Sequence, residues 1–311
     1  MLPTSSLQLS IGPVLYYWDK AQLLDFYQAL ATAPVQTVYL GEVVCSKRRS
    51  LRLPEWLDLA RHLTACGKQV VLSTLTLIEA QSELAGVERA CNNGEFLVEA
   101  NDMAAVQFCS ERGLPFVTGP HINLYNGRAL RFLQQSGLQR WVLPLELSRE
   151  QLQLLQQEAC ELSPAPLPEL EVFGYGLMPL AHSARCFTAR HHDLPKDRCE
   201  FRCIEDSDGM PVYSQDGDRL FTLNGIQTQS GRCLDLRHAW QDMQQRGVSA
   251  FRFNPHSPAF FASTQSFFES IQALADAIQG KRALEKARNA ETDCDGYWYG
   301  APGMIRVLPV S

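Results

Sequence analysis

The 311-residue sequence contains no apolar run long enough to span a lipid bilayer, which takes about 18 consecutive apolar residues. It also has no excess of basic residues, since 28 Lys and Arg against 34 Asp and Glu give a formal net charge of −6. A negative balance argues against general affinity for nucleic acid or for anionic membrane surfaces. We therefore expect neither a membrane span nor a nucleic-acid partner.

The first residues of the chain, Met1 to Gly12, lack the basic start and the long apolar stretch of a secretory signal peptide. We therefore expect a cytoplasmic protein. In that reducing compartment structural disulfides are rare, so the ten cysteines are packing residues, reactive thiols or metal ligands. Five of them lie in ordinary contexts and are expected to be packing residues: Cys66, Cys91, Cys109, Cys160 and Cys233.

Two kinds of functional motif are missing. The sequence has no HExxH motif and no convincing Ser/His/Asp set, which gives peptidase chemistry poor support. No Gly-rich nucleotide fingerprint follows the first expected strand, which disfavours a doubly wound, dinucleotide-binding sheet. That open sheet stays the alternative to the fold described next.

Short β-like runs alternate with helical patterns along the whole chain, and this alternation predicts a parallel sheet. The expected strands are 7–12, 37–44, 69–76, 96–99, 115–119, 140–145, 170–173 and 249–253. The expected helices are 20–31, 54–67, 78–90, 102–112, 127–135, 149–161, 234–246 and 259–280. Eight such units predict an α/β fold of the (β/α)8 TIM-barrel type, with residues 1–311 forming one domain.

A long interruption, residues 174–231, separates the seventh strand from the last helix–strand unit. Within it, residues 212–213 and 220–223 flank an Asp216–Gly217 turn signal, which predicts a β-hairpin.

The same interruption carries Cys186, Cys199 and Cys203 in the pattern C-x12-C-x3-C. One helical turn over Cys199–Cys203 would place both thiols on one face. Four cysteines close an iron–sulfur site, and Cys45 is the best fourth candidate because it follows the second strand, whose loop shares a barrel face with the loop after the seventh. The residues alone leave three options open: an iron–sulfur cluster, zinc, or no metal.

The residues around these cysteines bear on that choice. His182, His191 and His192 are alternative zinc ligands in or beside the segment. Basic residues flank all four cysteines, and we expect their charge to lower the thiol pKa values. They are Lys47, Arg48, Arg49, Arg52, Arg185, Arg190, Lys196, Arg198 and Arg202.

Polar residues also stand at the expected carboxyl ends of the strands, the position that carries function in barrels. We expect some of them to contact substrate, Arg252 by pairing with a carboxylate or phosphate and the glutamates by moving protons. The set is Glu42, Glu99, His121, Asn123, Glu171, Tyr175, Arg252 and Asn254.

Several segments together resemble the U32 peptidase family. They are Glu171-Val-Phe-Gly-Tyr-Gly-Leu-Met-Pro-Leu-Ala-His-Ser-Ala-Arg-Cys186, Val38-Tyr-Leu-Gly-Glu42, Glu99-Ala-Asn-Asp102 and Gly296-Tyr-Trp-Tyr-Gly-Ala-Pro-Gly303. One early cysteine followed by C-x12-C-x3-C is similar to the short U32 members that act in oxygen-independent ubiquinone biosynthesis.

This resemblance implies a [4Fe–4S] cluster on Cys45, Cys186, Cys199 and Cys203. It implies a role in hydroxylating the ubiquinone ring without O2, in a heterodimer with a UbiU-like U32 paralogue and in contact with other ubiquinone-biosynthesis proteins. The predicted hairpin and the aromatic run Tyr297–Tyr299 are candidate partner surfaces. A metal-stapled scaffold without chemistry of its own, and a U32 protease, are the alternative functions.

Overall fold

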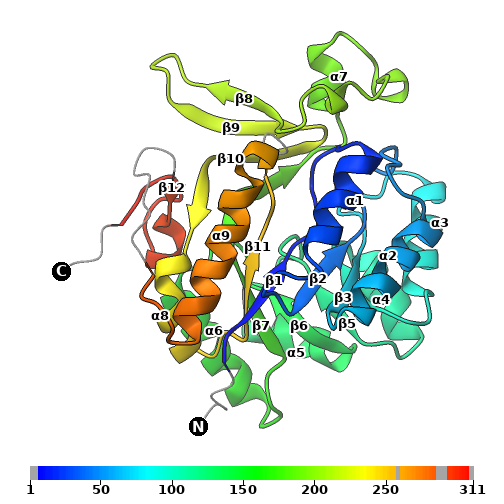
Figure 1. Ribbon diagram of the computed structural model, residues 1–311. Coiled ribbons are helices and arrows are strands. Elements are labelled where there is room, and N and C mark those ends of the chain that lie inside the picture. The colour runs from blue at the N-terminus through cyan, green and yellow to red at the C-terminus, as the bar shows by residue number, and fades with distance from the viewer. Residues whose placement is uncertain (1–5, 257–259, 285–292, 308–311) are drawn as a thin grey trace.

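The computed structural model describes residues 6–256, 260–284 and 293–307, and side chains from residue 257 to 265 are left out of the description. Within these residues, eight parallel strands form a ring in the order β11-β1-β2-β3-β4-β5-β6-β7, and pairing of β11 with β7 closes it (Figure 1). The predicted (β/α)8 barrel is therefore confirmed.

The barrel strands lie close to their expected places. They are β1 (Gln8–Ile11), β2 (Thr37–Leu40), β3 (Gln69–Ser73), β4 (Leu97–Ala100), β5 (Phe116–Thr118), β6 (Leu138–Val142), β7 (Glu169–His182) and β11 (Ala250–Phe253). Helices follow them on the outside: α1 (Lys20–Ala29), α2 (Leu53–Ala65), α3 (Gln81–Cys91), α4 (Met103–Glu111), α5 (Gly127–Gln135), α6 (Arg149–Leu162), α8 (Trp240–Gln245) and α9 (Phe260–Ile278).

Alternation along the strands sorts side chains into two layers. Tyr39, Val71 and Val117 form a small buried cluster of their own, while their neighbours Val38 and Leu72 join the large core under the helices. Helix starts obey local rules: Ser148 and Gln151 cap α6 reciprocally, each side chain accepting the other's backbone N–H.

The seventh strand differs from its prediction because β7 runs on to His182. Its second half leaves the barrel and pairs antiparallel with β10 (Gln227–Asp235), which pairs in turn with β9 (Arg219–Asn224) and β12 (Asp293–Cys294). β8 (Met210–Tyr213) and β9 form the expected hairpin, which projects from one end of the barrel beside α7 (Phe187–His191) (Figure 1).

The helix expected over 234–246 begins too early in the prediction. Leu234 is buried in β10, where it pairs with both β7 and β12, so sheet contacts override its helical pattern. The helical part is limited to a 3-10 turn, Arg237–Ala239, and to α8. Within the described residues no helix is both long enough and apolar enough to cross a bilayer.

Candidate functional site

Four cysteines from two distant parts of the chain line one small cavity. Cys45 lies on the loop between β2 and α2, and Cys186, Cys199 and Cys203 lie on the segment that follows β7. Both loops leave the carboxyl ends of their strands, so the barrel topology brings them to the same end. This is the juxtaposition on which the fourth-ligand prediction depends.

Local backbone geometry orients the three later thiols. Cys186 is the N-cap of α7, and its Sγ accepts the N–H of Ala189 at 3.4 Å. Glu200 and Phe201 stand between Cys199 and Cys203 with φ of +51° and +56°. The expected single helical turn is therefore wrong: two short 3-10 turns, Lys196–Arg198 and Arg202–Ile204, flank a left-handed pair that L-residues adopt at a cost.

The cysteine segment is anchored on the turn between β9 and β10. Phe187 N–H donates to Gly225 O at 2.7 Å, and Gly225 N–H donates to Thr188 Oγ1 at 3.1 Å. On the other side, Lys47 Nζ donates to Lys196 O at 2.9 Å, which joins the Cys45 loop to the same segment. Contacts outside the cysteines thus hold the cavity together.

Burial dominates the electrostatics of the cavity. It raises the pKa values of the thiols of Cys45, Cys186 and Cys203, and the nearby Arg48 guanidinium offsets only part of this rise. The Arg48 guanidinium lowers these pKa values as expected, but burial outweighs it, so the predicted net lowering is wrong. Arg48 is 3% exposed and donates to Leu15 O and Asn224 Oδ1, both at 2.7 Å, which fixes its charge beside the thiols.

Among the described residues, the lining of this cavity contains no histidine, because His182 lies in a different cleft and neither His191 nor His192 reaches the lining. In the described part of the chain, no three Cys, His, Asp or Glu side chains are grouped as they stand to hold a metal ion. The other cysteines divide: Cys91, Cys109 and Cys233 are buried as expected, whereas Cys66 and Cys160 are exposed.

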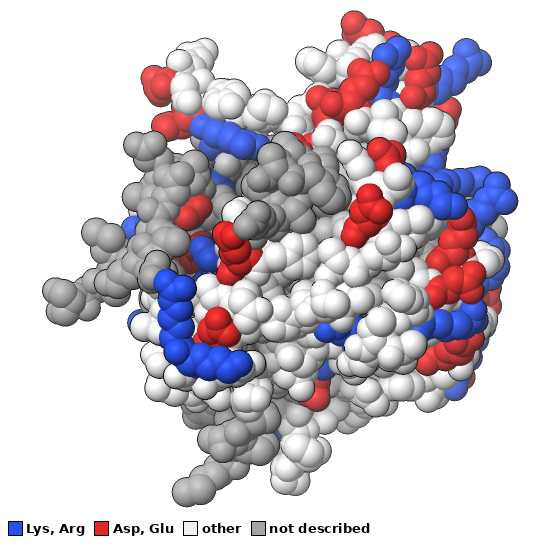
Figure 2. Space-filling view, viewed as in Figure 1, with Lys and Arg blue, Asp and Glu red and all other residues white. Residues whose placement is uncertain are grey.

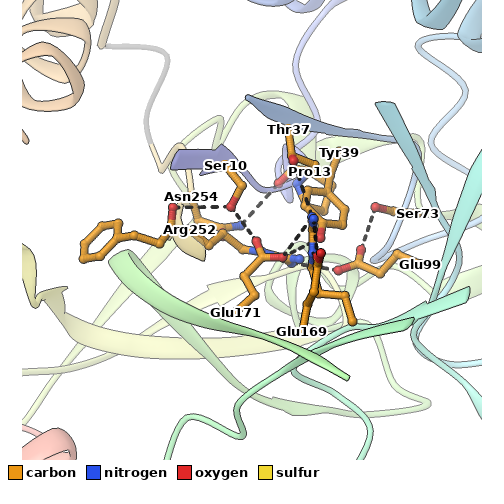
Figure 3. A network of polar contacts seen from close by, with 12 residues as sticks. Ser10, Pro13, Thr37, Tyr39, Ser73, Glu99, Glu169, Glu171, Arg252 and Asn254 are labelled. Carbon is orange, nitrogen blue, oxygen red and sulfur yellow. Dashed lines mark hydrogen bonds and ion pairs between the residues drawn. The ribbon is translucent and has the colours of Figure 1, made fainter. Parts of the chain in front are cut away.

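A second polar centre fills the barrel interior, where Arg252 lies between two carboxylates (Figure 3). Its Nε donates to Glu171 Oε1 at 2.8 Å and its Nη1 donates to Glu99 Oε1 at 2.7 Å. Its guanidinium carbon stands 3.9 Å from the centre of the Tyr39 ring, and Tyr39 OH donates to Glu171 Oε2. All four side chains are almost completely buried.

The two positive charges near Glu171 decide its protonation. Burial favours the neutral acid, but the guanidinium groups of Arg252 and Arg140 outweigh it and lower the pKa of Glu171 to about 2. Glu171 is therefore an anion that holds Arg252, which leaves it unsuited to exchange protons near neutral pH. Ser73 Oγ donates to Glu99 Oε2 at 2.6 Å and extends the network to β3.

Above this network, the barrel mouth holds an inner cavity and an outer cleft. Arg252, Asn101 and Asn254 line the inner cavity, and Asn123 and His182 line the outer cleft of about 580 Å³. Pro120, His121 and Pro179 line both. The strand-end pattern therefore brings Glu99, His121, Asn123, Arg252 and Asn254 to one place.

Two of the expected substrate residues lie elsewhere. Glu42 Oε1 accepts the backbone N–H groups of Val44 and Cys45, both at 3.0 Å, so it shapes the turn of the first cysteine. The Tyr175 ring packs against Phe253 and against other aromatic rings.

Asn101 was not among the predicted site residues, although it follows β4 directly and carries the same strand-end signal as Glu99. Arg48 was predicted only as one charge in a basic run, because the sequence gives no sign that this one residue is buried.

Comparison with known proteins supports the resemblance to the U32 family. A model of peptidase family U32 matches residues 21–302. The chain belongs to this family. A protein named collagenase from Porphyromonas gingivalis is 23% identical over 214 residues, covering 65% of this chain and 50% of that protein, so the chain spans about half the length of this curated relative.

Solved structures with similar folds include the U32 peptidase Mk0906, at a TM-score of 0.45 and 12% identity, covering 82% of this chain and 95% of that one. A tryptophan synthase complex from Pyrococcus furiosus has a TM-score of 0.46 at 11% identity, covering 88% of this chain and 99% of that one.

Proposed function

We propose that this U32 protein holds a [4Fe–4S] cluster on Cys45, Cys186, Cys199 and Cys203. We further propose that it acts, like the UbiV-type members it resembles, with a UbiU-like paralogue in oxygen-independent hydroxylation of the ubiquinone ring. The observation that carries the proposal is that these four cysteines, in the pattern quoted above, line one cavity.

The donor set fits the group. Four thiolates make a closed shell for an iron–sulfur cluster, and Arg48 supplies a fixed positive charge that balances part of its negative charge. Because burial keeps three of the thiols protonated, binding would release protons. When bound, such a cluster supplies one-electron transfer, and a closed shell suits electron transfer or structure better than substrate ligation.

A peptidase function has weaker support from the site. A cysteine nucleophile needs a base within hydrogen-bond reach, and no histidine lines the cysteine cavity in the described part of the chain. The arguments in favour are the name of the family matched over residues 21–302 and the collagenase relative, whose similarity covers about half of that relative.

Anaerobic purification tests the cluster. We expect brown protein with about four iron and about four sulfide per chain, and loss of most of both in Cys45→Ala, Cys186→Ala, Cys199→Ala and Cys203→Ala. Cys160→Ala is the matched control, because Cys160 is exposed on α6 and should leave the metal content unchanged. Stoichiometric zinc without sulfide would contradict the proposal.

A deletion strain tests the metabolic role. It should make ubiquinone in air and fail to do so without oxygen, and the gene encoding Cys160→Ala should restore synthesis where Cys45→Ala does not. If the purified protein carries the cluster but the deletion strain makes normal amounts of ubiquinone without oxygen, the biosynthetic role is excluded and the scaffold function remains.

A further inference from the structure

The inner cavity of the barrel mouth is built from polar atoms that lack partners. Arg252 Nη2, Asn101 Oδ1 and Asn254 Oδ1 are buried and have no hydrogen-bond partner in the described part of the chain. All three residues line this one cavity and are at most 3% exposed. Buried polar groups normally find partners, so this cluster of orphaned atoms points to a missing ligand group.

Two glycines leave room for the amide groups of Asn101 and Asn254. A Cβ on Gly119, which follows β5, would lie 1.8 Å from Asn101 Oδ1, and a Cβ on Gly12, which follows β1, would lie 2.3 Å from Asn254 Oδ1. Only glycine at these two strand ends therefore lets the amides reach their positions. The cavity they border measures about 10 Å³, which is room for one water-sized group.

The charge balance excludes an ionic group in this cavity. The positive charge of Arg252 is already matched by Glu99 and Glu171, so no net positive charge is left to hold a carboxylate. An ammonium group would face the guanidinium N–H. The partnerless set is one donor and two acceptors. A hydroxyl group accepts from Arg252 Nη2 and donates its single O–H to one of the two amide oxygens.

The outer cleft is also lined mostly by uncharged side chains. Burial lowers the pKa values of His121 and His182, the latter to about 4, so both rings are uncharged near neutral pH. Glu146, exposed at the rim, is the charged residue in the cleft lining among the described residues. Prolines and aliphatic side chains make up much of the remaining wall: Pro120, Pro144, Leu145, Pro179 and Leu180.

We propose that the barrel mouth binds an uncharged compound that carries a hydroxyl group on an apolar body. The hydroxyl accepts from Arg252 Nη2 and donates to one of the two asparagine amides, and the body lies in the outer cleft. The Arg252–Glu171–Glu99 network holds the donor in place before the ligand arrives, which lowers the cost of binding. None of these residues is a proposed cluster ligand, so the inference goes beyond the proposed function and stands if that function fails.

Binding of three small probes to the full chain tests this site. Phenol, toluene and benzoate share a ring and differ in the group offered to the inner cavity. We expect phenol to bind about tenfold more tightly than toluene, the worth of one good hydrogen bond, and benzoate to bind more weakly than phenol in ligand-observed NMR titrations. Equal affinity for phenol and toluene, or preference for benzoate, would overturn the proposal.

Two variants locate the hydroxyl. Asn254→Leu and Asn101→Leu each remove one candidate acceptor. The ratio of phenol to toluene affinity should fall toward one in the variant that loses the acceptor of the hydroxyl, while toluene still binds. Asn92→Leu, at an exposed position after α3, should leave the ratio at its original value. An unchanged ratio in both cavity variants, or a phenol-soaked crystal in which the cavity holds water only, would refute the assignment.

Discussion

In the barrel interior, the charged side chains of Arg252, Glu171 and Glu99 hold one another in fixed positions. A buried ion pair is weak evidence for stability, because desolvation offsets the attraction between the charges. Arg252 between Glu171 and Glu99 is better understood as an arrangement that fixes a donor at the mouth. Removing one partner leaves the other charge buried, and that cost is measurable.

The first prediction concerns Glu171→Gln. At pH 7 the variant should unfold at a lower urea concentration than the parent. Its free energy of unfolding should be smaller by about 3 to 5 kcal/mol, because Arg252 loses a charged partner. The folded pKa of Glu171, about 2, lies below the usual value of about 4.3, so its stabilisation is present above pH 4.3 and is lost as the pH falls toward 2. The gap between variant and parent should therefore shrink over that window.

Urea unfolding at pH 7, 5, 4 and 3 measures this gap. Glu169→Gln is the control, because Glu169 also pairs with an arginine but has a side chain that is 58% exposed, so the substitution should cost less than about 1 kcal/mol. A gap for Glu171→Gln that stays constant from pH 7 to pH 3 would show that the carboxylate charge is not the source of the effect.

At the scale of elements, the barrel was predictable and the antiparallel extension was not. The barrel strands are short, buried on both faces and followed by amphipathic helices, so their pattern is local. β10 instead buries Gln227, Gln229 and Ser230, which are typical of a loop in sequence. Their partners lie far away: Tyr16 OH donates to Gln229 Oε1 at 2.9 Å, and Met178 N–H donates to Ser230 Oγ at 2.9 Å.

One local signal for this extension was present. Asn224 and Gln227 pair across a two-residue turn, Gly225–Ile226, and Gly225 has φ of +64°, as a hairpin turn with glycine in its first central position requires. The meeting of the four cysteines at one cavity could be predicted for a different reason, since barrel topology brings two strand-end loops together. The thiol pKa values could not be predicted, because the sequence shows charges but not burial.

The second prediction concerns this turn and rests on the proposed cluster. Gly225→Ala should strain the turn by about 1 kcal/mol and place a methyl group 2.9 Å from Arg48 Nη2, beside the cavity. We expect iron and sulfide content to fall severalfold although all four cysteines are present. Gly217→Ala is the matched control: φ there is +89°, but no atom lies within 4 Å of the added Cβ. Equal metal loss in both variants would assign the effect to strain alone.

At the scale of the whole molecule, the structure distinguishes the two candidate partner surfaces, which are the C-terminal aromatic run and the hairpin. Trp298 in the C-terminal aromatic run is 2% exposed, and its Nε1 donates to Asp242 Oδ2 at 3.0 Å, so it packs on its own barrel. A loss of association in Trp298→Ala would therefore reflect folding. The hairpin and the cysteine segment instead project from the barrel, and acidic and basic side chains mix on the part near α7 (Figure 2).

Large apolar side chains gather on these projecting parts. Tyr213 and Phe221 on the hairpin are 58% and 39% exposed, and Phe201 and Ile204 on the cysteine segment are also exposed. Apolar and aromatic residues surrounded by charges are typical of the centre of a protein interface. We therefore place the proposed contact with the UbiU-like paralogue on this end of the molecule.

The last prediction is that Tyr213→Ser weakens this association at least tenfold, because truncated aromatic anchors commonly cost about 1.4 kcal/mol or more. Iron and sulfide content should stay at the parental level, since Tyr213 does not line the cysteine cavity. Phe132→Ser is the matched control: Phe132 is 62% exposed on α5, outside the projecting segments, and its loss should leave the dissociation constant unchanged. Light scattering of co-expressed chains and titration of the separated ones measure the effect. A pair that associates equally well with both variants would move the interface elsewhere, and a chain that stays monomeric with its paralogue at micromolar concentration would remove it.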